Sequence, residues 1–158
     1  MTRSLCALAL AALVSLPAHA GRKDAAPAAA PAAAPAPAMT VTPVADRVWA
    51  PLDPTNPGGL QVSLLSGDMQ KGPTSFFLRL PAGSKSPGHT HTHTYYGVVV
   101  QGAPGHGLTA DAATQGLPVG STWVQPGGQA HYDACNSAEP CVLLLVYPTG
   151  GFDFQMAE

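Results

Sequence analysis

Charge is scarce in this chain of 158 residues, because only 10% of them are Asp, Glu, Lys or Arg. The seven basic residues form no patch, which excludes a nucleic-acid partner, since phosphates require clustered positive charge. The sequence also lacks a lysine-rich amphipathic stretch, which argues against binding to a membrane surface. After residue 20 it contains six basic and nine acidic residues, a balance of −3.

Several catalytic signatures are missing as well. The sequence contains no phosphate-binding loop, no dinucleotide-binding fingerprint and no nucleophile elbow. No pair of carboxylates lies in the two histidine-containing stretches, 83–102 and 120–135, which counts against glycosidase-type acid–base chemistry. The apolar run at residues 5–16 is too short for a comfortable membrane span, and nothing after it resembles one.

The first forty residues are interpreted as a targeting segment followed by a linker. Arg3, the apolar run and the ending Ala18-His19-Ala20 predict a secretory signal peptide at residues 1–20, with cleavage after Ala20. We therefore expect a periplasmic or secreted chain with no membrane insertion after cleavage. Residues 21–40 are rich in Ala and Pro and predict a disordered, semi-rigid linker. Residues 41–158 remain for one domain with a single modest core.

Two cysteines remain after cleavage, Cys135 and Cys141, in the stretch CNSAEPC. Export places them in an oxidising compartment, and the pair brackets a short turn. The spacing favours a disulfide that closes a hairpin, provided that the two Cα atoms lie within about 7 Å. Metal binding by the two thiolates is the alternative.

The domain is expected to be all-β with little helix. Strand-like runs at 61–65, 75–80, 89–100, 122–125 and 141–147 alternate with segments rich in Gly and Pro, such as 102–107. No long 3.6-residue apolar period follows residue 40, and many short strands suggest a sandwich or small barrel. Phe76, Leu78 and Leu80 alternate and are expected to face the interior.

The stretch around residue 90 contains three of the six histidines at alternate positions. Successive side chains of a strand point to opposite faces, so His89, His91, His93 and Tyr95 would share one face, with Tyr96 on the other. The strand continues into a valine-rich sequence that looks buried, which argues against the alternative, a solvent-facing polar strip. Because clustered neutral imidazoles are common ligands of Zn, Cu, Fe and Ni, the pattern favours a metal site.

A second stretch carries a family resemblance. Residues 83–102 read G-x5-H-x-H-x3-Y-x6-G and residues 120–131 read G-x5-P-x-G-x2-H, with seventeen residues between them. These two patterns resemble the first and second cupin motifs. The whole chain is similar to exported single-domain bacterial cupins of unassigned activity and to the cupin domains of anti-sigma factors. The resemblance implies a single small cupin barrel, a double-stranded β-helix or jelly roll of two packed sheets.

The resemblance also implies a metal centre. Carried over, the family's histidine ligands are His89, His91 and His131, which would hold one divalent transition metal: Fe, Mn, Zn, Cu or Ni. Three imidazoles leave coordination positions open for water, oxygen or substrate. The sequence departs from the family at two positions, because Tyr95 replaces the usual glutamate ligand and Cys135 the final asparagine.

Tyr95 and His93 are the candidate catalytic residues, steering protons at the metal. Tyr95 would donate a hydrogen bond to a bound water, fill space, or ligate as a phenolate, and His93 is the other replacement for the missing ligand. The leading hypothesis is an oxygen-dependent or Lewis-acid enzyme acting on a small organic substrate. The alternatives are a non-catalytic module that binds or senses a metal or small molecule, and a structural barrel that has lost its metal. Homodimers are common among such barrels.

Other residues are assigned plainer roles. His106, flanked by glycines in GAPGHGL, is expected at the surface in a turn. Asp133 has the same parity as His131 and lies either behind the site or at the surface. Trp49 and Trp123 are expected in the core or at its rim.

Overall fold

The computed structural model describes residues 38–157, so the expected signal peptide and most of the expected linker lie outside it. This part of the chain contains two 3-10 helices, η1 (Val44–Asp46) and η2 (Ala112–Thr114), and short strands. The strands are β1 (Ala50–Pro51), β2 (Gln61–Gly67), β3 (Thr74–Leu80), β4 (His89–Thr90), β5 (Tyr95–Gln101), β6 (Pro104–Gly107), β7 (Thr122–Gln125), β8 (Tyr132–Cys135), β9 (Cys141–Tyr147) and β10 (Gln155–Met156). Within residues 38–157 no helix is long and apolar enough to cross a membrane.

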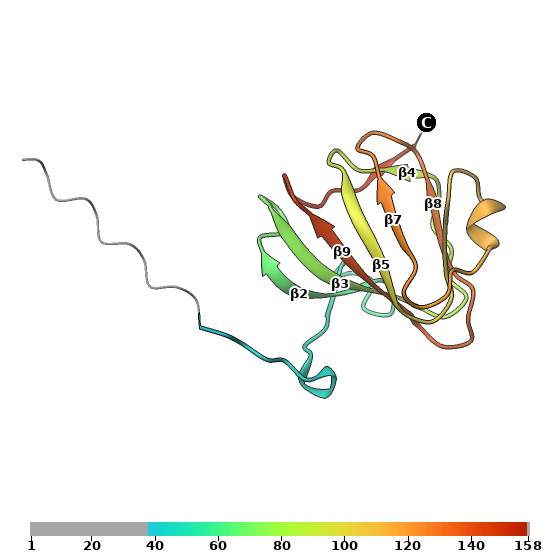
Figure 1. Cartoon of the computed structure of the whole chain (residues 1–158). Coiled ribbons are helices and arrows are strands. Elements are labelled where there is room, and N and C mark those ends of the chain that lie inside the picture. The colour runs from blue at the N-terminus through green and yellow to red at the C-terminus, as the bar shows by residue number, and fades with distance from the viewer. Residues whose placement is uncertain (1–37, 158) are drawn as a thin grey trace, which may run out of the picture. The chain divides into compact units, whose positions relative to one another are not determined.

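The strands form two antiparallel layers. The larger sheet has the order β1-β2-β3-β9-β5-β7, and Figure 1 shows β2 to β7 of this sheet side by side. The other layer contains the pairs β10-β4 and β6-β8, which are joined by isolated bridges between His89 and His131 and between Lys85 and Ala134. The expectation of an all-β, two-sheet barrel with little helix is confirmed.

The core lies on the inner face of the larger sheet. Along β3 the residues alternate between buried and half-buried, and Phe76, Leu78 and Leu80 are 0%, 8% and 5% exposed. These three side chains face inward as predicted, whereas Tyr96 is exposed on the outer face. Alternate residues of β5 and β9 complete the same apolar layer.

The continuous strand expected at residues 89–100 is wrong, because residues 91–94 form a loop between β4 and β5. Tertiary contacts hold this loop against the turn after β7. The backbone N–H of Gly127 donates to Thr94 Oγ1 at 3.0 Å, and that of Gly128 donates to the carbonyl of His91 at 2.8 Å. A Cβ atom on Gly127 would lie 2.4 Å from the Thr92 carbonyl oxygen, so only glycine allows this approach.

The prediction of a turn at residues 102–107 is also wrong in part, because residues 104–107 form strand β6. β6 pairs with β8 in a register that places His106 opposite Asp133. Gly105 lies so close to η2 that a Cβ atom would meet the Ala113 carbonyl oxygen at 1.6 Å. Glycine here permits close packing of a strand rather than marking a turn.

The two cysteines are bonded to each other. Cys135 at the end of β8 and Cys141 at the start of β9 have Cα atoms 5.6 Å apart, within the range of a disulfide. The bond therefore joins the two layers of the barrel and closes the short turn between these strands. This arrangement matches the disulfide reading of the sequence rather than its thiolate–metal alternative.

Removing this bond is expected to lower the free energy of unfolding by about 2 kcal/mol, because a short loop restricts the unfolded chain modestly. Urea unfolding of the parent and of a Cys135→Ala/Cys141→Ala variant measures the difference. The parent treated with a reductant at the same pH serves as the control and should unfold at a similar urea concentration. Equal midpoints for the oxidised parent and the variant would contradict the expectation.

Candidate metal centre

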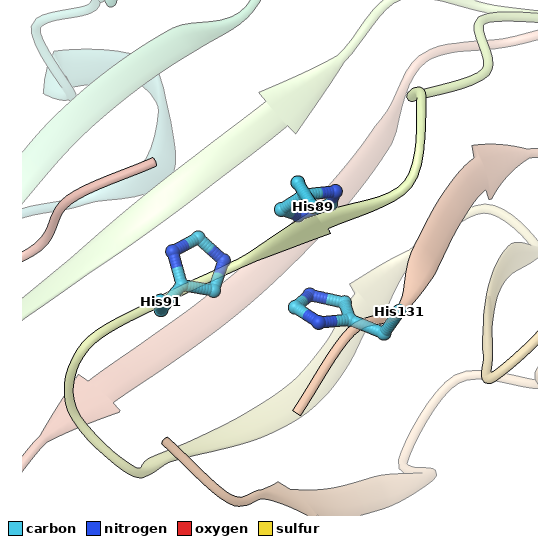
Figure 2. A group of neighbouring side chains, drawn as sticks. All are labelled: His89, His91 and His131. Carbon is cyan, nitrogen blue, oxygen red and sulfur yellow. The ribbon is translucent and has the colours of Figure 1, made fainter. Parts of the chain in front are cut away.

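Three imidazole rings lie together inside the barrel, as Figure 2 shows. His89 comes from β4, His91 from the loop after it, and His131 from the segment that leads into β8. Their residues are 2%, 5% and 0% exposed. One ring nitrogen from each lies within 4.8 Å of the other two, so the structure brings the three predicted ligands into one cluster.

Backbone pairing brings the two histidine-containing stretches together. His89 and His131 exchange two backbone hydrogen bonds of 3.0 and 2.9 Å, so they are directly opposed residues of an antiparallel bridge. Side chains of such a pair leave the same face of the sheet. Their ring centroids lie 4.2 Å apart, and the His91 ring is 5.1 and 5.2 Å from the other two.

Each of the three rings is oriented by a backbone carbonyl group. The Nδ1 contacts are His89 with Pro87 O at 3.0 Å, His131 with Gln129 O at 3.2 Å, and His91 with Asp153 O. A carbonyl oxygen only accepts hydrogen bonds, so we assign the ring proton to Nδ1 in all three. Each Nε2 atom then keeps its lone pair, which is the state in which imidazole binds a metal.

Burial also favours the neutral form of the His131 and His91 rings. It lowers the pKa of His131 to about 4 and lowers that of His91 as well. Loss of hydration outweighs the opposite effect of Asp133 at His131 and that of the hydrogen bond to the Asp153 carbonyl at His91. The neutral form of these two rings is the form that binds a metal, so the donor set fits the divalent transition metal that the sequence predicted.

Asp133 adds a carboxylate behind the cluster. Its Oδ1 lies 2.7 Å from His106 Nδ1, while its Oδ2 lies 3.4 Å from His89 Nε2 and 3.8 Å from His131 Nε2. Burial acts to raise the pKa of Asp133, but the opposing effects, led by the hydrogen bond from His106, outweigh it and hold that pKa well below its usual range. Of its two predicted places, Asp133 occupies the one beside the site, as a carboxylate.

Tyr95 lies beside the cluster at the position of the usual cupin glutamate. The residue is 2% exposed, and its hydroxyl group is 3.3 Å from His131 Nε2. Since that nitrogen carries a lone pair, the hydroxyl donates to it. Burial raises the pKa of Tyr95, followed by the effect of Asp133, so the side chain is a phenol and a hydrogen-bond donor.

His93 does not lie in the cluster. Its ring covers the backbone of Gly150, where a Cβ atom would come within 2.1 Å of its Nε2 atom. Because residues 91–94 form a loop, the alternation of side chains ends after His91 and no longer places His93 on the face of His89.

His106 was missed, because it was expected at the surface. Its side chain is only 10% exposed and stacks on Trp123, with ring centroids 4.7 Å apart at 25°. Its two ring nitrogens contact Asp133 Oδ1 and, at 3.0 Å, Gln125 Oε1. The flanking glycines suggested a turn, and a Pro-Gly-His-Gly sequence contains no signal typical of a strand.

A cavity of about 240 Å³ adjoins the cluster. His89, His91 and Tyr95 form part of its wall, and the charged side chains in its lining are those of Lys85 and Asp133. The large apolar side chains that line it are those of Leu60, Leu78, Leu80, Leu143, Leu145, Phe152 and Phe154. A cavity of this kind accommodates a small molecule with a largely apolar body.

Solved structures similar to this chain share its fold. An RmlC-like cupin protein from Ralstonia eutropha JMP134 is 23% identical, with a TM-score of 0.54 over 70% of this chain and 69% of its own. An uncharacterised Klebsiella pneumoniae protein with a double-stranded β-helix domain is 18% identical, with a TM-score of 0.56 over 75% and 91%. A chain in the complex of Rhodobacter sphaeroides SigE with the anti-sigma ChrR is 20% identical, with a TM-score of 0.50 over 66% and 50%.

The family of the chain follows from a family model rather than from a curated relative. No curated protein matches the chain. Residues 40–155, most of the chain, match a domain of unknown function, DUF4437. The structural neighbours confirm the cupin resemblance read from the two motifs. Because their sequence identity to this chain is low, they inform on its fold alone. The chain therefore belongs to the DUF4437 family, and its domain is a cupin barrel.

Proposed function

We propose that this protein binds one divalent transition metal through His89, His91 and His131 and presents it to a small organic molecule. The observation that carries the proposal is the orientation of the three rings. Backbone carbonyl groups hold each Nδ1–H, so each Nε2 atom keeps a lone pair, and that of His131 accepts a hydrogen bond from Tyr95. The three rings form one buried cluster. This arrangement orients metal-binding histidines in proteins generally.

The adjoining cavity supports an organic ligand. Its apolar lining would bury the body of the molecule, while the imidazoles in its wall direct a polar group toward the metal. A bound metal polarises an oxygen atom of such a ligand. A metal bound to His131 Nε2 would occupy the lone pair to which the Tyr95 hydroxyl donates, and would leave that hydroxyl to donate a hydrogen bond to the ligand. Exposed Lys85 favours a ligand with negative charge.

We also place the protein in the periplasm or outside the cell. The predicted signal peptide is the main support. The disulfide between Cys135 and Cys141 is consistent with it, because such bonds persist in oxidising compartments.

Elemental analysis of the protein purified from the periplasm without chelators tests the metal proposal. We expect about one divalent transition metal per chain, lost on dialysis against a strong chelator and regained on adding metal. Binding to the folded state alone should also raise the unfolding temperature. A chain that contains no metal and takes up none of Mn, Fe, Co, Ni, Cu or Zn would overturn the proposal.

A further inference from the structure

A polar network lies behind the three-histidine cluster, on β6, β7 and β8. Asp133 is its centre, with one carboxylate oxygen directed to His106 and the other to His89 and His131. Gln125 lies on the far side of His106 and is 2% exposed. Buried polar groups must each find a partner, so the protons of this network can be assigned from its contacts.

The proton on His106 is fixed by Gln125. The amide nitrogen of Gln125 donates to the carbonyl oxygens of Gln129 and Pro126, at 2.8 and 3.2 Å. Its Oε1 atom therefore faces His106 Nε2 and accepts a hydrogen bond from it. The short contact of 2.7 Å between His106 Nδ1 and Asp133 Oδ1 requires a second proton between them. His106 thus holds Oδ1 and fixes the carboxylate.

The other oxygen, Asp133 Oδ2, has no such partner. It lies 3.4 Å from His89 Nε2 and 3.8 Å from His131 Nε2, and both nitrogens carry lone pairs because their Nδ1–H groups donate to carbonyls. Within the described part of the chain, the hydrogen bond that reaches these three atoms is that of the Tyr95 hydroxyl to His131 Nε2. The Asp133 side chain is 17% exposed and borders the cavity. Lone pairs that face one another at these distances repel, and a cation placed between them removes the repulsion.

We propose that Asp133 Oδ2 is the fourth protein ligand of the metal. This assignment rests on the three-histidine function proposed above. It places the carboxylate ligand on β8 instead of at position 95, where the usual cupin glutamate would lie. Ligands about 2.1 Å from one ion lie roughly 3.0–3.4 Å from each other. The separation of 3.4 Å from His89 Nε2 falls in this range, and that of 3.8 Å from His131 Nε2 would shorten when the ion binds. His106 acts as a positioning residue. The site takes a divalent cation that accepts three nitrogens and one oxygen.

A second group of possible ligands overlaps this one, namely His106, His131 and Asp133. His106 is unsuited to it, because both of its nitrogens are engaged, one with Gln125 and one with Asp133. The same carboxylate therefore serves the site of His89 and His131, which its Oδ2 atom faces, rather than a site of its own.

Cobalt binding to the full chain tests the assignment. The Co²⁺ affinity is measured by competition with a chelator, and the visible absorption of bound Co²⁺ reports its ligands. Asp133→Asn keeps the shape of the side chain. It is expected to weaken Co²⁺ binding at least about 100-fold and to change the absorption spectrum. Loss of a residue that only orients a ligand already weakens binding about 10–100-fold, so loss of a ligand should weaken it more. His106→Gln should weaken binding about 10-fold with the spectrum retained. The matched control is exposed Asp111→Asn, which should leave both unchanged.

The outcomes separate the two proposals. Parent protein that binds no Co²⁺ would overturn the three-histidine function and this assignment together. Parent protein that binds Co²⁺, with unchanged affinity and spectrum in Asp133→Asn, would overturn the assignment alone. A larger loss in Tyr95→Phe than in Asp133→Asn would place the fourth ligand at position 95 instead. If Asp133→Asn fails to fold, infrared difference spectra of the parent decide, since a bound carboxylate shifts its stretching bands on Co²⁺ loading and a free one does not.

Discussion

Protein carrying His91→Ala is expected to lose its metal, with an affinity at least about 100-fold below that of the parent. Removing a partner that only orients a ligand costs about 10–100-fold, and removing the ligand itself costs more. The His91 ring is buried, and its Nδ1 is held by the Asp153 carbonyl, so its Nε2 is already directed for binding. Metal content after purification and chelator competition at pH 7 measure the loss.

His93→Ala provides the control from the same loop. His93 lies two residues further along the chain, on the backbone of Gly150 and outside the cluster. The variant removes one imidazole, as His91→Ala does, but it should keep about one metal per chain. If both variants lose the metal, or if neither does, the three-histidine cluster is not the binding site.

That His89, His91 and His131 form one cluster was predictable, because it depends on local patterns. The two motifs fix where glycine and proline turn the chain, and the bridge between His89 and His131 then brings the motifs together. The inward face of β3 was equally accessible, since Phe76 and its neighbours follow a simple alternation. Strands β7 and β9 have the bounds that the sequence predicted, because glycine- and proline-rich segments flank them.

What the sequence did not predict depends on contacts between distant segments. The loop at 91–94 exists because Gly127 packs against it, and a run of alternating residues contains no sign of that contact. The same holds for the pair of His106 and Asp133, which are 27 residues apart and opposed only through the register of β6 and β8. A histidine between glycines is usually a surface residue, and tertiary packing overrides that preference here.

Phe76→Ala is expected to cost about 3–5 kcal/mol of folding free energy, a large part of the roughly 5–15 kcal/mol typical of a domain. The residue is 0% exposed, and its ring stacks near Tyr147 and meets Phe152 edge-on, with centroids 6.1 and 5.4 Å apart. Truncation therefore leaves a cavity in the centre of the apolar layer. Urea unfolding, followed by tryptophan fluorescence in the metal-free protein, measures the loss.

The neighbouring Phe77→Ala is the matched control, because Phe77 faces the outer side of β3 under the Arg47 guanidinium group, 3.8 Å above its ring. Its removal should cost about 1 kcal/mol. Equal losses in the two variants would contradict the assignment of the two faces. The centroid of the Phe152 ring also lies 5.3 Å from that of the His91 ring. The space left by Phe76→Ala would therefore adjoin a side chain that packs against a proposed metal ligand. Weakened metal binding in Phe76→Ala but not in Phe77→Ala would show that core packing holds the cluster in place.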